Sequence, residues 1–254
     1  MILVLAGTRD GRELAAALTL EGYPVLTTVV SGYGRDLAEA DGLAVSGGAL
    51  DEKGLAEVIG QKGIRLVVDA THPYAAAVSR NAMAACGRLG VRYLRYERPA
   101  APLPAYGRLH RAKDAAEAAR CAAGLGKVVF LTTGSRNLRN FKAEPALAGA
   151  RLIVRVLPDP EVIAQCLGLG FSPRDIVALQ GPFSHDLNVA LFKEYGSEVV
   201  ITKNSGLVGG SDSKFSAAAA LGLHLVVIDR PAMDYPLAVS SLATVLEYAR
   251  EVMT

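Results

Sequence analysis

Four polar side chains that can do chemistry follow one apolar run of the sequence. The run at residues 65–68 leads into Asp69-Ala70-Thr71-His72-Pro73-Tyr74, which brings together a carboxylate, a hydroxyl, an imidazole and a phenol. A turn that only starts a helix needs one polar cap, and Asp69 or Thr71 would serve, with Pro73 as the first helical residue. One cap leaves the other polar groups unexplained. The segment therefore predicts a site at the carboxyl end of a buried strand, where open α/β sheets bind ligands.

A glycine-containing turn, Gly7-Thr8-Arg9-Asp10-Gly11-Arg12, follows the first apolar run and opens the first expected helix. Glycines let backbone N–H groups approach a phosphate, and the helix N-terminus adds partial positive charge. The match to the dinucleotide-binding pattern G-x-G-x-x-G is partial, because Ala6 fills one glycine position. A plain tight turn is the alternative.

The end of the second apolar run bears on the choice of cofactor. An acidic residue there binds the ribose 2′-hydroxyl of NAD, whereas an arginine suits the 2′-phosphate of NADP. This chain has no acid at that point but has Ser31 and Arg35. The pattern favours NADPH, with a solvated loop charge as the alternative interpretation of Arg35. The dinucleotide-binding residues that we expect are Gly7, Thr8, Gly11, Arg12, Ser31, Arg35, Ala70 and Thr71.

Polar residues also follow apolar runs in the second half of the chain, in the segments 132–137, 155–158, 180–184 and 202–206. Ser135 could cap a helix, and Arg136 or Arg139 could clamp a carboxylate in bidentate fashion. A lysine at a buried strand end is costly unless it is paired or functional, so Lys203 is a site candidate, with a surface lysine as the alternative. Lys214 is expected on the solvated start of a helix.

Apolar runs alternate with alanine-rich helical segments, which predicts an α/β fold of mostly parallel strands joined by right-handed crossovers. The runs are continuous, as in strands buried on both faces. The expected strands are residues 2–6, 25–30, 43–45, 66–69, 93–96, 128–131, 152–156, 176–178, 198–202 and 225–228. The expected helices include residues 11–21, 52–62, 75–89, 113–122, 159–168, 187–195 and 240–253.

A proline-rich patch at residues 99–104 predicts a linker between two halves. We expect a dinucleotide-binding domain at residues 1–101 and a substrate-side domain at residues 102–254, with the last helix, 240–253, able to pack on either. A weak internal repeat in the sequence supports two related halves. Each ends with a strand, a polar turn, an alanine-rich helix, a Leu-Gly pair, a further strand and an Arg-Pro pair.

Composition narrows the functional classes. The 254 residues are 51% hydrophobic and 20% charged, as in globular proteins, and the net charge of +2 does not indicate a nucleic-acid partner. No leader or membrane span is expected, because no uncharged stretch reaches the roughly 18 residues that a span needs. The three cysteines lack C-x-x-C spacing and read as reduced, which predicts a cytoplasmic protein. The four histidines lack metal-ligand spacing, so no protein-bound metal is expected.

Six segments, in this order, resemble the precorrin-6A reductase family: Ala6–Arg12, Asp69–Ala75, Arg95–Pro99, Thr132–Ser135, Gln180–Ser184 and Thr202–Gly206 with Lys214. The resemblance implies two Rossmann-like domains with the active site in the cleft between them. It also implies NADPH- or NADH-dependent reduction of one double bond of a corrin precursor during cobalamin biosynthesis, with possible hand-over to other enzymes of the corrin pathway.

Under this resemblance the tetrapyrrole substrate carries acetate and propionate arms that arginine and lysine would hold by charge-assisted hydrogen bonds. Lys203 or His72 would deliver the proton that completes the reduction. The substrate-binding residues that we expect are Tyr74, Ser135, Arg136, Ser184, Ser205 and Lys214, with Arg139 and Arg155 as further carboxylate clamps.

Two branches of the family act on metal-free precorrin-6A and on its cobalt complex. The segment Val45–Glu52 resembles the cobalt branch, to which NADH is usually assigned, and Arg35 favours NADPH, so the cofactor stays open. A non-catalytic nucleotide-sensing module is the rival from a different class. A short-chain dehydrogenase is excluded, because no tyrosine is followed four residues later by a lysine.

Overall fold

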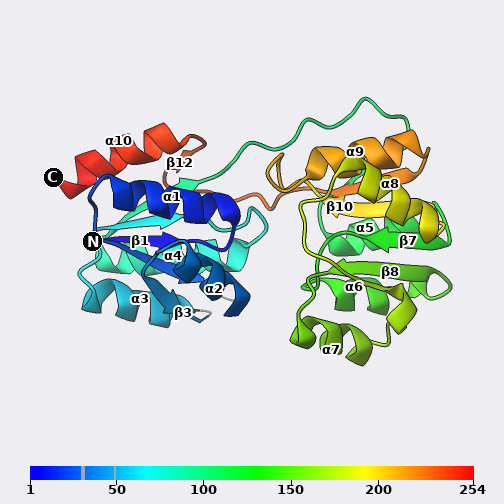
Figure 1. The fold of residues 1–254 in the computed structure, drawn as a ribbon, viewed down its shortest axis with the longest axis horizontal. Helices are drawn as coiled ribbons and strands as arrows, with labels where there is room; N and C mark the ends of the chain where they lie inside the picture. The colour runs from blue at the N-terminus through cyan, green and yellow to red at the C-terminus, as the bar shows by residue number, and fades with distance from the viewer. Residues whose placement is uncertain (30–31, 49) are drawn as a thin grey trace. The chain divides into compact units, whose positions relative to one another are not determined.

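The apolar runs form two parallel sheets in a computed structural model that describes residues 1–29, 32–48 and 50–254 (Figure 1). Unit 1 comprises Met1–Pro99 together with Ala232–Thr254, and unit 2 comprises Ala100–Pro231. The second domain was expected to continue to residue 254. Residues 232–254 instead return to unit 1, because they supply it with an edge strand and a helix.

Unit 1 has the strand order of a dinucleotide-binding Rossmann fold. Its strands are β1 (Ile2–Leu5), β2 (Val25–Val29), β3 (Val45–Gly47), β4 (Leu66–Asp69), β5 (Arg92–Tyr96) and β12 (Ala238–Val239). They pair in parallel in the order β3-β2-β1-β4-β5-β12, which is the 3-2-1-4-5-6 arrangement. The order reverses between β1 and β4, and sheets of this kind bind ligands beyond the carboxyl ends of the strands at that point.

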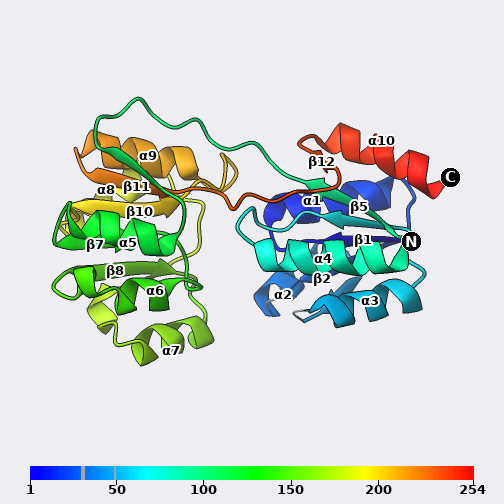
Figure 2. The ribbon, with the colours of Figure 1, turned by 180° about the vertical axis from the view of Figure 1, so that it is seen from behind.

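Helices cover both faces of the unit 1 sheet (Figures 1 and 2). One face packs against α1 (Arg9–Leu20), α2 (Gly32–Ala40) and α10 (Leu242–Met253), and the other packs against α3 (Glu52–Gln61) and α4 (Ala76–Leu89). Successive residues of a strand point to opposite faces, so Ile2 and Val4 belong to the first core and Leu3 and Leu5 to the second.

Unit 2 repeats this topology. Its strands are β6 (Leu109–Ala112), β7 (Val128–Leu131), β8 (Arg151–Val156), β9 (Ile176–Ala178), β10 (Val199–Lys203) and β11 (His224–Ile228). The order is β9-β8-β7-β10-β11-β6, again parallel throughout, with the reversal between β7 and β10. In each unit five strands follow in sequence, and the sixth comes from outside them. The shared topology of the two units agrees with the weak internal repeat of the sequence.

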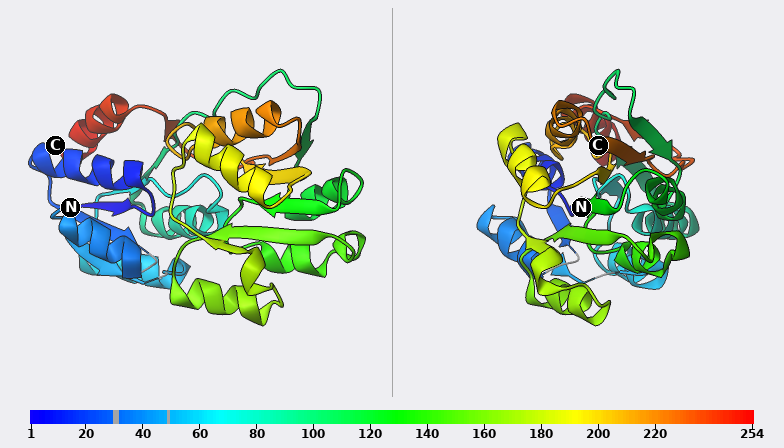
Figure 3. Two further views of the ribbon diagram at one scale, coloured as in Figure 1. Left: turned by 45° about the vertical axis from the view of Figure 1, so that its right-hand side comes forward. Right: turned by 90° about the vertical axis from the view of Figure 1, so that its right-hand side faces the viewer.

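The helices of unit 2 are α5 (Ala115–Ala123), α6 (Leu138–Ala143), α7 (Pro160–Gly168), α8 (His185–Glu194) and α9 (Ser211–Ala220), with short 3-10 turns at Pro145–Leu147 and Pro173–Asp175. The helices α8 and α9 lie side by side (Figure 3) and cover one face of the sheet. Phe130, Phe192 and Phe215 fill this core, and the first two rings meet edge to face at 5.1 Å. No helix in the described part of the chain has the length and apolar character to cross a bilayer.

The sequence did not predict the sixth strand of either sheet. Strand β6 carries His110 and Arg111 in four residues, and β12 is only two residues long, so neither has an apolar run. Helices α2 and α6 were not predicted either. The first contains two glycines, and the second is six residues long.

The C-terminal helix α10 belongs to the core of unit 1, where Val245 and Ala249 are fully buried. Its N-cap is Ser241, whose hydroxyl accepts a hydrogen bond from the Thr244 N–H at 3.1 Å. Its burial against β4 and β5 makes the end of the chain part of the first unit.

Replacement of Val245 by Ala should therefore destabilise unit 1 by roughly 1–3 kcal/mol, because it leaves a cavity in a closed core. Hydrogen exchange followed by mass spectrometry should show faster exchange in β1, β4 and β5 and unchanged exchange in β7 and β10. The exposed Glu247→Ala on the same helix is the control. Faster exchange in unit 2 would contradict the assignment of α10.

Candidate functional site

Thr8 ties the carboxyl ends of β1 and β4 together at the reversal point of unit 1. It is the N-cap of α1, and its hydroxyl accepts a hydrogen bond from the Gly11 N–H at 3.3 Å. The same hydroxyl donates to the Ala70 carbonyl at 3.2 Å. The turn after β1 and the turn after β4 therefore form one structure.

The two glycines of the first turn have different roles. A Cβ at Gly11 would lie 3.0 Å from the Ala70 carbonyl oxygen and 3.1 Å from Ala6 Cα, so close backbone packing requires glycine there. A Cβ at Gly7 would meet nothing within 4 Å, and the residue is exposed. Among the described residues no contact requires glycine at Gly7, and the space beside the start of α1 is open.

Charge at the start of α1 is balanced by an ion pair. Asp10 lies in the first turn, where its carboxylate would repel a phosphate, but Arg98 Nη1 contacts Asp10 Oδ1 at 2.5 Å. The pair leaves the helix N-terminus electrostatically suited to an anion. Arg12, which we expected to bind the dinucleotide, has its Nε 2.8 Å from Asp41 Oδ2. That contact gives Arg12 a role in packing α1 against the end of α2.

The carboxylate of Asp69 organises the segment after β4. It is completely buried and accepts hydrogen bonds from the Thr71 N–H at 3.0 Å and from the Thr71 hydroxyl at 2.7 Å. Ser79 and Tyr93 donate from their hydroxyls at 2.6 and 2.7 Å. Burial, followed by the charge of Asp69, raises the pKa of Tyr93, so the phenol stays protonated as a donor. Asp69 thus positions Thr71 instead of facing a ligand.

Arg95 supplies the positive charge that this buried carboxylate needs. It is 1% exposed, and its Nη1 lies 2.9 Å from Asp69 Oδ1 and 3.1 Å from Thr71 Oγ1. Tyr235 stacks against the guanidinium, with the ring centroid 5.3 Å from Cζ. Tyr235 belongs to the segment that returns from unit 2, so the C-terminal part of the chain completes the network.

His72 and Tyr74 follow on the same segment and are both half-buried. The Tyr74 N–H donates to His72 Nδ1 at 3.2 Å, and the two rings lie 5.6 Å apart. A ring nitrogen that accepts from a backbone N–H carries no proton, so the neutral imidazole holds its proton on Nε2. His72 can therefore donate a hydrogen bond or a proton only from Nε2 in this arrangement.

Of the two residues that bear on cofactor choice, Ser31 lies outside the described residues. Arg35 lies on α2, the helix that follows β2, and its side chain is exposed. It is available to a ligand at the carboxyl edge of unit 1, where α2 begins.

In unit 2, Lys203 bridges the two strands at the reversal point, as Thr8 does in unit 1. It ends β10, and its Nζ donates to the Thr133 carbonyl beyond β7 at 3.0 Å. Burial, with a smaller contribution from the charge of Arg136, lowers the pKa of Lys203 to about 8. The Thr133 hydroxyl is buried and has no hydrogen-bond partner among the described residues. A lysine that exchanges its proton near neutral pH and an unsatisfied hydroxyl therefore meet at this point.

Three serines that we expected in or near the substrate site have identifiable local contacts. Ser184 caps α8 by accepting from the Leu187 N–H at 3.2 Å. Ser205 is buried in the loop after β10, with its hydroxyl 3.3 Å from that of Ser211. Ser135 was expected as a possible helix cap, but Asn137 is the N-cap of α6. The Ser135 carbonyl instead accepts from the Leu138 N–H at 3.3 Å.

Lys214 differs from its expected environment. It was predicted on a solvated helix start, but it lies inside α9 with 8% of its surface exposed. The helix begins at Ser211, after the loop Asn204–Gly210 that follows β10. The Lys214 Nζ contacts the Gly209 carbonyl at 3.4 Å. Arg155, one residue before the end of β8, is similarly buried at 7% exposure.

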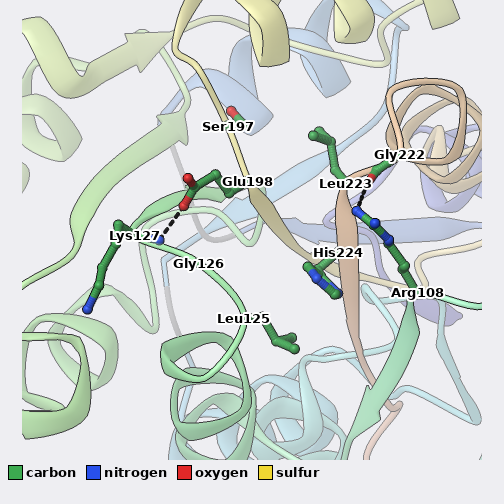
Figure 4. A pocket seen from close by; sticks show the side chains of 9 residues that line it. All are labelled: Arg108, Leu125, Gly126, Lys127, Ser197, Glu198, Gly222, Leu223 and His224. Carbon is green, nitrogen blue, oxygen red and sulfur yellow. Dashed lines mark hydrogen bonds between the residues drawn. The ribbon is translucent and has the colours of Figure 1, made fainter.

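A pocket of about 450 Å³ opens at the opposite edge of the unit 2 sheet (Figure 4). Its lining residues precede β6, β7, β10 and β11, except His224, which is the first residue of β11, so the pocket lies at the amino ends of these strands, away from Lys203. Arg108 donates to the Gly222 carbonyl there, and Glu198 accepts from the Lys127 N–H. The position of this pocket separates it from the residues described above.

The sequence model of the family described as Precorrin-6x reductase CbiJ/CobK matches residues 1–250. The chain belongs to this family. Among curated relatives, the cobalt-precorrin-6A reductase of Priestia megaterium is 39% identical over 237 residues, 92% of each chain. The precorrin-6A reductase of Rhodococcus erythropolis is 36% identical, covering 91% of this chain and 89% of that one. A solved CobK precorrin-6A reductase structure has a TM-score of 0.80 at 30% identity, covering 98% and 96% of the two chains.

Membership of the precorrin-6x reductase family agrees with the resemblance of the six sequence segments. Within unit 1 the structure brings together Gly7, Thr8, Gly11, Ala70 and Thr71, and within unit 2 it brings Lys203 to the Thr133 loop. The partnership of Asp69 with Arg95 was not predicted, because 26 residues separate them and only the register of β4 and β5 joins them. A buried-strand arginine such as Arg95 is the sequence signal that could have revealed it.

Replacement of Asp69 by Asn should destabilise the protein by about 3–5 kcal/mol, because Arg95 is left buried without its counter-charge. Adding Arg95→Met should cost at least about 2 kcal/mol less than the sum of the single changes. Urea unfolding followed by tyrosine fluorescence measures both. Asp41→Asn, which breaks the more exposed Arg12 pair, is the control and should cost about 0–1 kcal/mol. Additive effects of Asp69 and Arg95 would refute the network.

Proposed function

We propose that the protein reduces one double bond of the precorrin-6A macrocycle, with or without cobalt, using a nicotinamide dinucleotide. Family membership over residues 1–250 carries this proposal. The Rossmann strand order of unit 1 and the open space at Gly7 support a dinucleotide there. When bound, the cofactor supplies the hydride, and the protein contributes orientation and electrostatics.

In this proposal unit 1 holds the dinucleotide. Backbone N–H groups at the start of α1 and the Gly7–Thr8 turn bind the pyrophosphate, aided by the helix dipole and by the neutralisation of Asp10. Ala70 and Thr71 contact the nicotinamide half, with Thr71 held by Asp69. These residues fit a dinucleotide in two ways. The start of α1 offers backbone N–H donors to the pyrophosphate, and it follows the first strand at the point where the strand order reverses.

Unit 2 holds the substrate through cations at the carboxyl ends of its strands, where Arg136 is exposed and Lys203 half-buried. Acetate and propionate arms would accept charge-assisted hydrogen bonds from them. We further propose that Lys203 Nζ or His72 Nε2 holds the proton that completes the reduction. Tyr74 and Ser135, both half-buried, are proposed as further substrate contacts.

The setting that we propose is the cytoplasm, with direct hand-over of product to other enzymes of the corrin pathway. Cys86, Cys121 and Cys166 form no disulfide with one another, which fits a reducing compartment. A fractionation of the native cells would test the location.

The reaction is tested by supplying purified protein with NADH or NADPH and with metal-free or cobalt-containing precorrin-6A. Cofactor oxidation should require the tetrapyrrole, and the four combinations identify the preferred cofactor and metal state. Cofactor binding without oxidation in any combination would favour a nucleotide-sensing module instead.

Cofactor preference should respond to Arg35. The change Arg35→Glu should weaken NADPH binding by about 10-fold or more and affect NADH much less, since repulsion replaces attraction to the 2′-phosphate. Fluorescence titration measures both dissociation constants. Lys62→Glu makes the same change in net charge at the far end of α3 and should alter neither. Equal losses for both cofactors would remove Arg35 from the site.

The role of Lys203 should appear in the pH profile. If protonated Lys203 is the acid, kcat/KM falls as the pH rises through about 8, because the ammonium form is lost. Lys203→Ala should lower kcat by about 100-fold and remove this limb, with dinucleotide affinity unchanged. A loss confined to KM would make Lys203 a carboxylate clamp. Unchanged kcat and KM would show that Lys203 only joins the ends of β7 and β10 and takes no part in the reaction.

A further inference from the structure

Unit 2 buries two cations without the counter-charges that unit 1 provides for its own. In unit 1, buried Arg95 and Arg98 each contact a carboxylate, at 2.9 and 2.5 Å. In unit 2, Arg155 and Lys214 are equally buried, at 7% and 8% exposure. Neither takes part in any ion pair formed by the described residues. Buried charges are usually paired, so this contrast indicates a place that suits an anion.

The hydrogen bonds at this point are too few to replace an anion. Arg155 Nη1 donates to Asn188 Oδ1 at 2.8 Å, and a guanidinium has five N–H donors in all. The Asn188 amide is oriented by donating to the Ser184 carbonyl at 2.8 Å. The Phe183 ring lies against the guanidinium, with its centroid 4.4 Å from Cζ, and this contact limits the orientations of the group. The remaining donors of Arg155 suit a bidentate carboxylate.

We propose that Arg155 and Lys214 form a site for one carboxylate arm of the substrate, and that binding there takes up a proton on Lys214. The inference rests on the proposed function, which supplies a polycarboxylate ligand. The buried pair would bind a carboxylate of the substrate more strongly than the exposed Arg136 and Arg139, because exposed ion pairs contribute little to binding.

The proton uptake follows from the charges around Lys214. Burial, and then the charge of Arg155, lowers the pKa of Lys214 to about 7, and Lys203 acts in the same direction. Asp212 on the same helix raises the pKa but does not offset the other effects. On the neighbouring α8, His185 bonds the Ser216 hydroxyl at 2.8 Å. A carboxylate placed against Arg155 and Lys214 adds the opposite charge and raises the pKa of the lysine.

Calorimetric titration in buffers of different ionisation enthalpy measures the protons taken up. The probe is a stable corrin with free acetate and propionate arms, and the protein carries Lys203→Met so that the neighbouring lysine cannot contribute. Uptake should be larger at pH 8 than at pH 6, because the neutral fraction of a lysine whose pKa is about 7 grows as the pH rises. Lys214→Met should abolish the uptake, and Arg155→Gln should weaken binding about 30-fold. The exposed Lys193→Met is the control and should change neither.

Binding without uptake at pH 8, or uptake that survives Lys214→Met, would overturn the proposal. If the wild-type protein nevertheless reduces the macrocycle, the proposed function stands and only this site is wrong. If the wild-type protein neither binds the probe nor reduces a tetrapyrrole, both fail.

Stability provides a second measurement that needs no ligand. The pKa of Lys214 is about 7 in the folded protein and 10.5 as a free side chain, so the unfolded chain binds more protons between these values. Wild-type stability relative to Lys214→Met should therefore rise with pH from about 7 towards 10.5. A difference independent of pH would show that folding does not lower the pKa of Lys214, and would overturn the proposed proton uptake.

Discussion

The reversal of strand order in each parallel sheet is the constraint on which the rest of the structure depends. All strands of a parallel sheet end at the same edge, and the crossovers leave in opposite directions at the reversal. Side chains from two turns distant in sequence therefore meet there without blocking the edge. Thr8 and Ala70 meet in this way in unit 1, and Lys203 and Thr133 do so in unit 2.

The two units use the same topology with opposite electrostatics. Unit 1 neutralises its buried charges internally, through Asp69 with Arg95 and Asp10 with Arg98, and so presents a helix N-terminus and backbone donors. In unit 2, neither Arg155 nor Lys214 forms an ion pair within the described part of the chain. A neutral edge fits a dinucleotide, whereas a cationic edge fits a polycarboxylate. This division of charge supports the proposal that the cofactor binds to unit 1 and the macrocycle to unit 2.

The sequence predicts what is local and misses what depends on tertiary contacts. Apolar runs such as Leu66–Asp69 and Val128–Leu131 locate strands directly, because both faces of these strands are buried. Strands β6 and β12 form because each can pair with the edge strand of a sheet. No local sequence pattern therefore predicts them. The burial of Lys214 likewise depends on tertiary contacts, among them the Gly209 carbonyl of the preceding loop. Turns that carry several polar residues predicted the candidate site segments, but the sequence could not show that Asp69 positions Thr71 while His72 stays half-buried.

Hydride transfer from a nicotinamide dinucleotide to the macrocycle is what the proposed function requires of this protein. It is tested most directly with cofactor that carries deuterium at both nicotinamide C4 positions, with precorrin-6A or its cobalt complex, and with mass and NMR analysis of the product. We expect one deuterium on a ring carbon of the reduced macrocycle, with a second hydrogen on the neighbouring carbon taken from solvent. A product without deuterium, or cofactor oxidation in the absence of a reduced macrocycle, would contradict it.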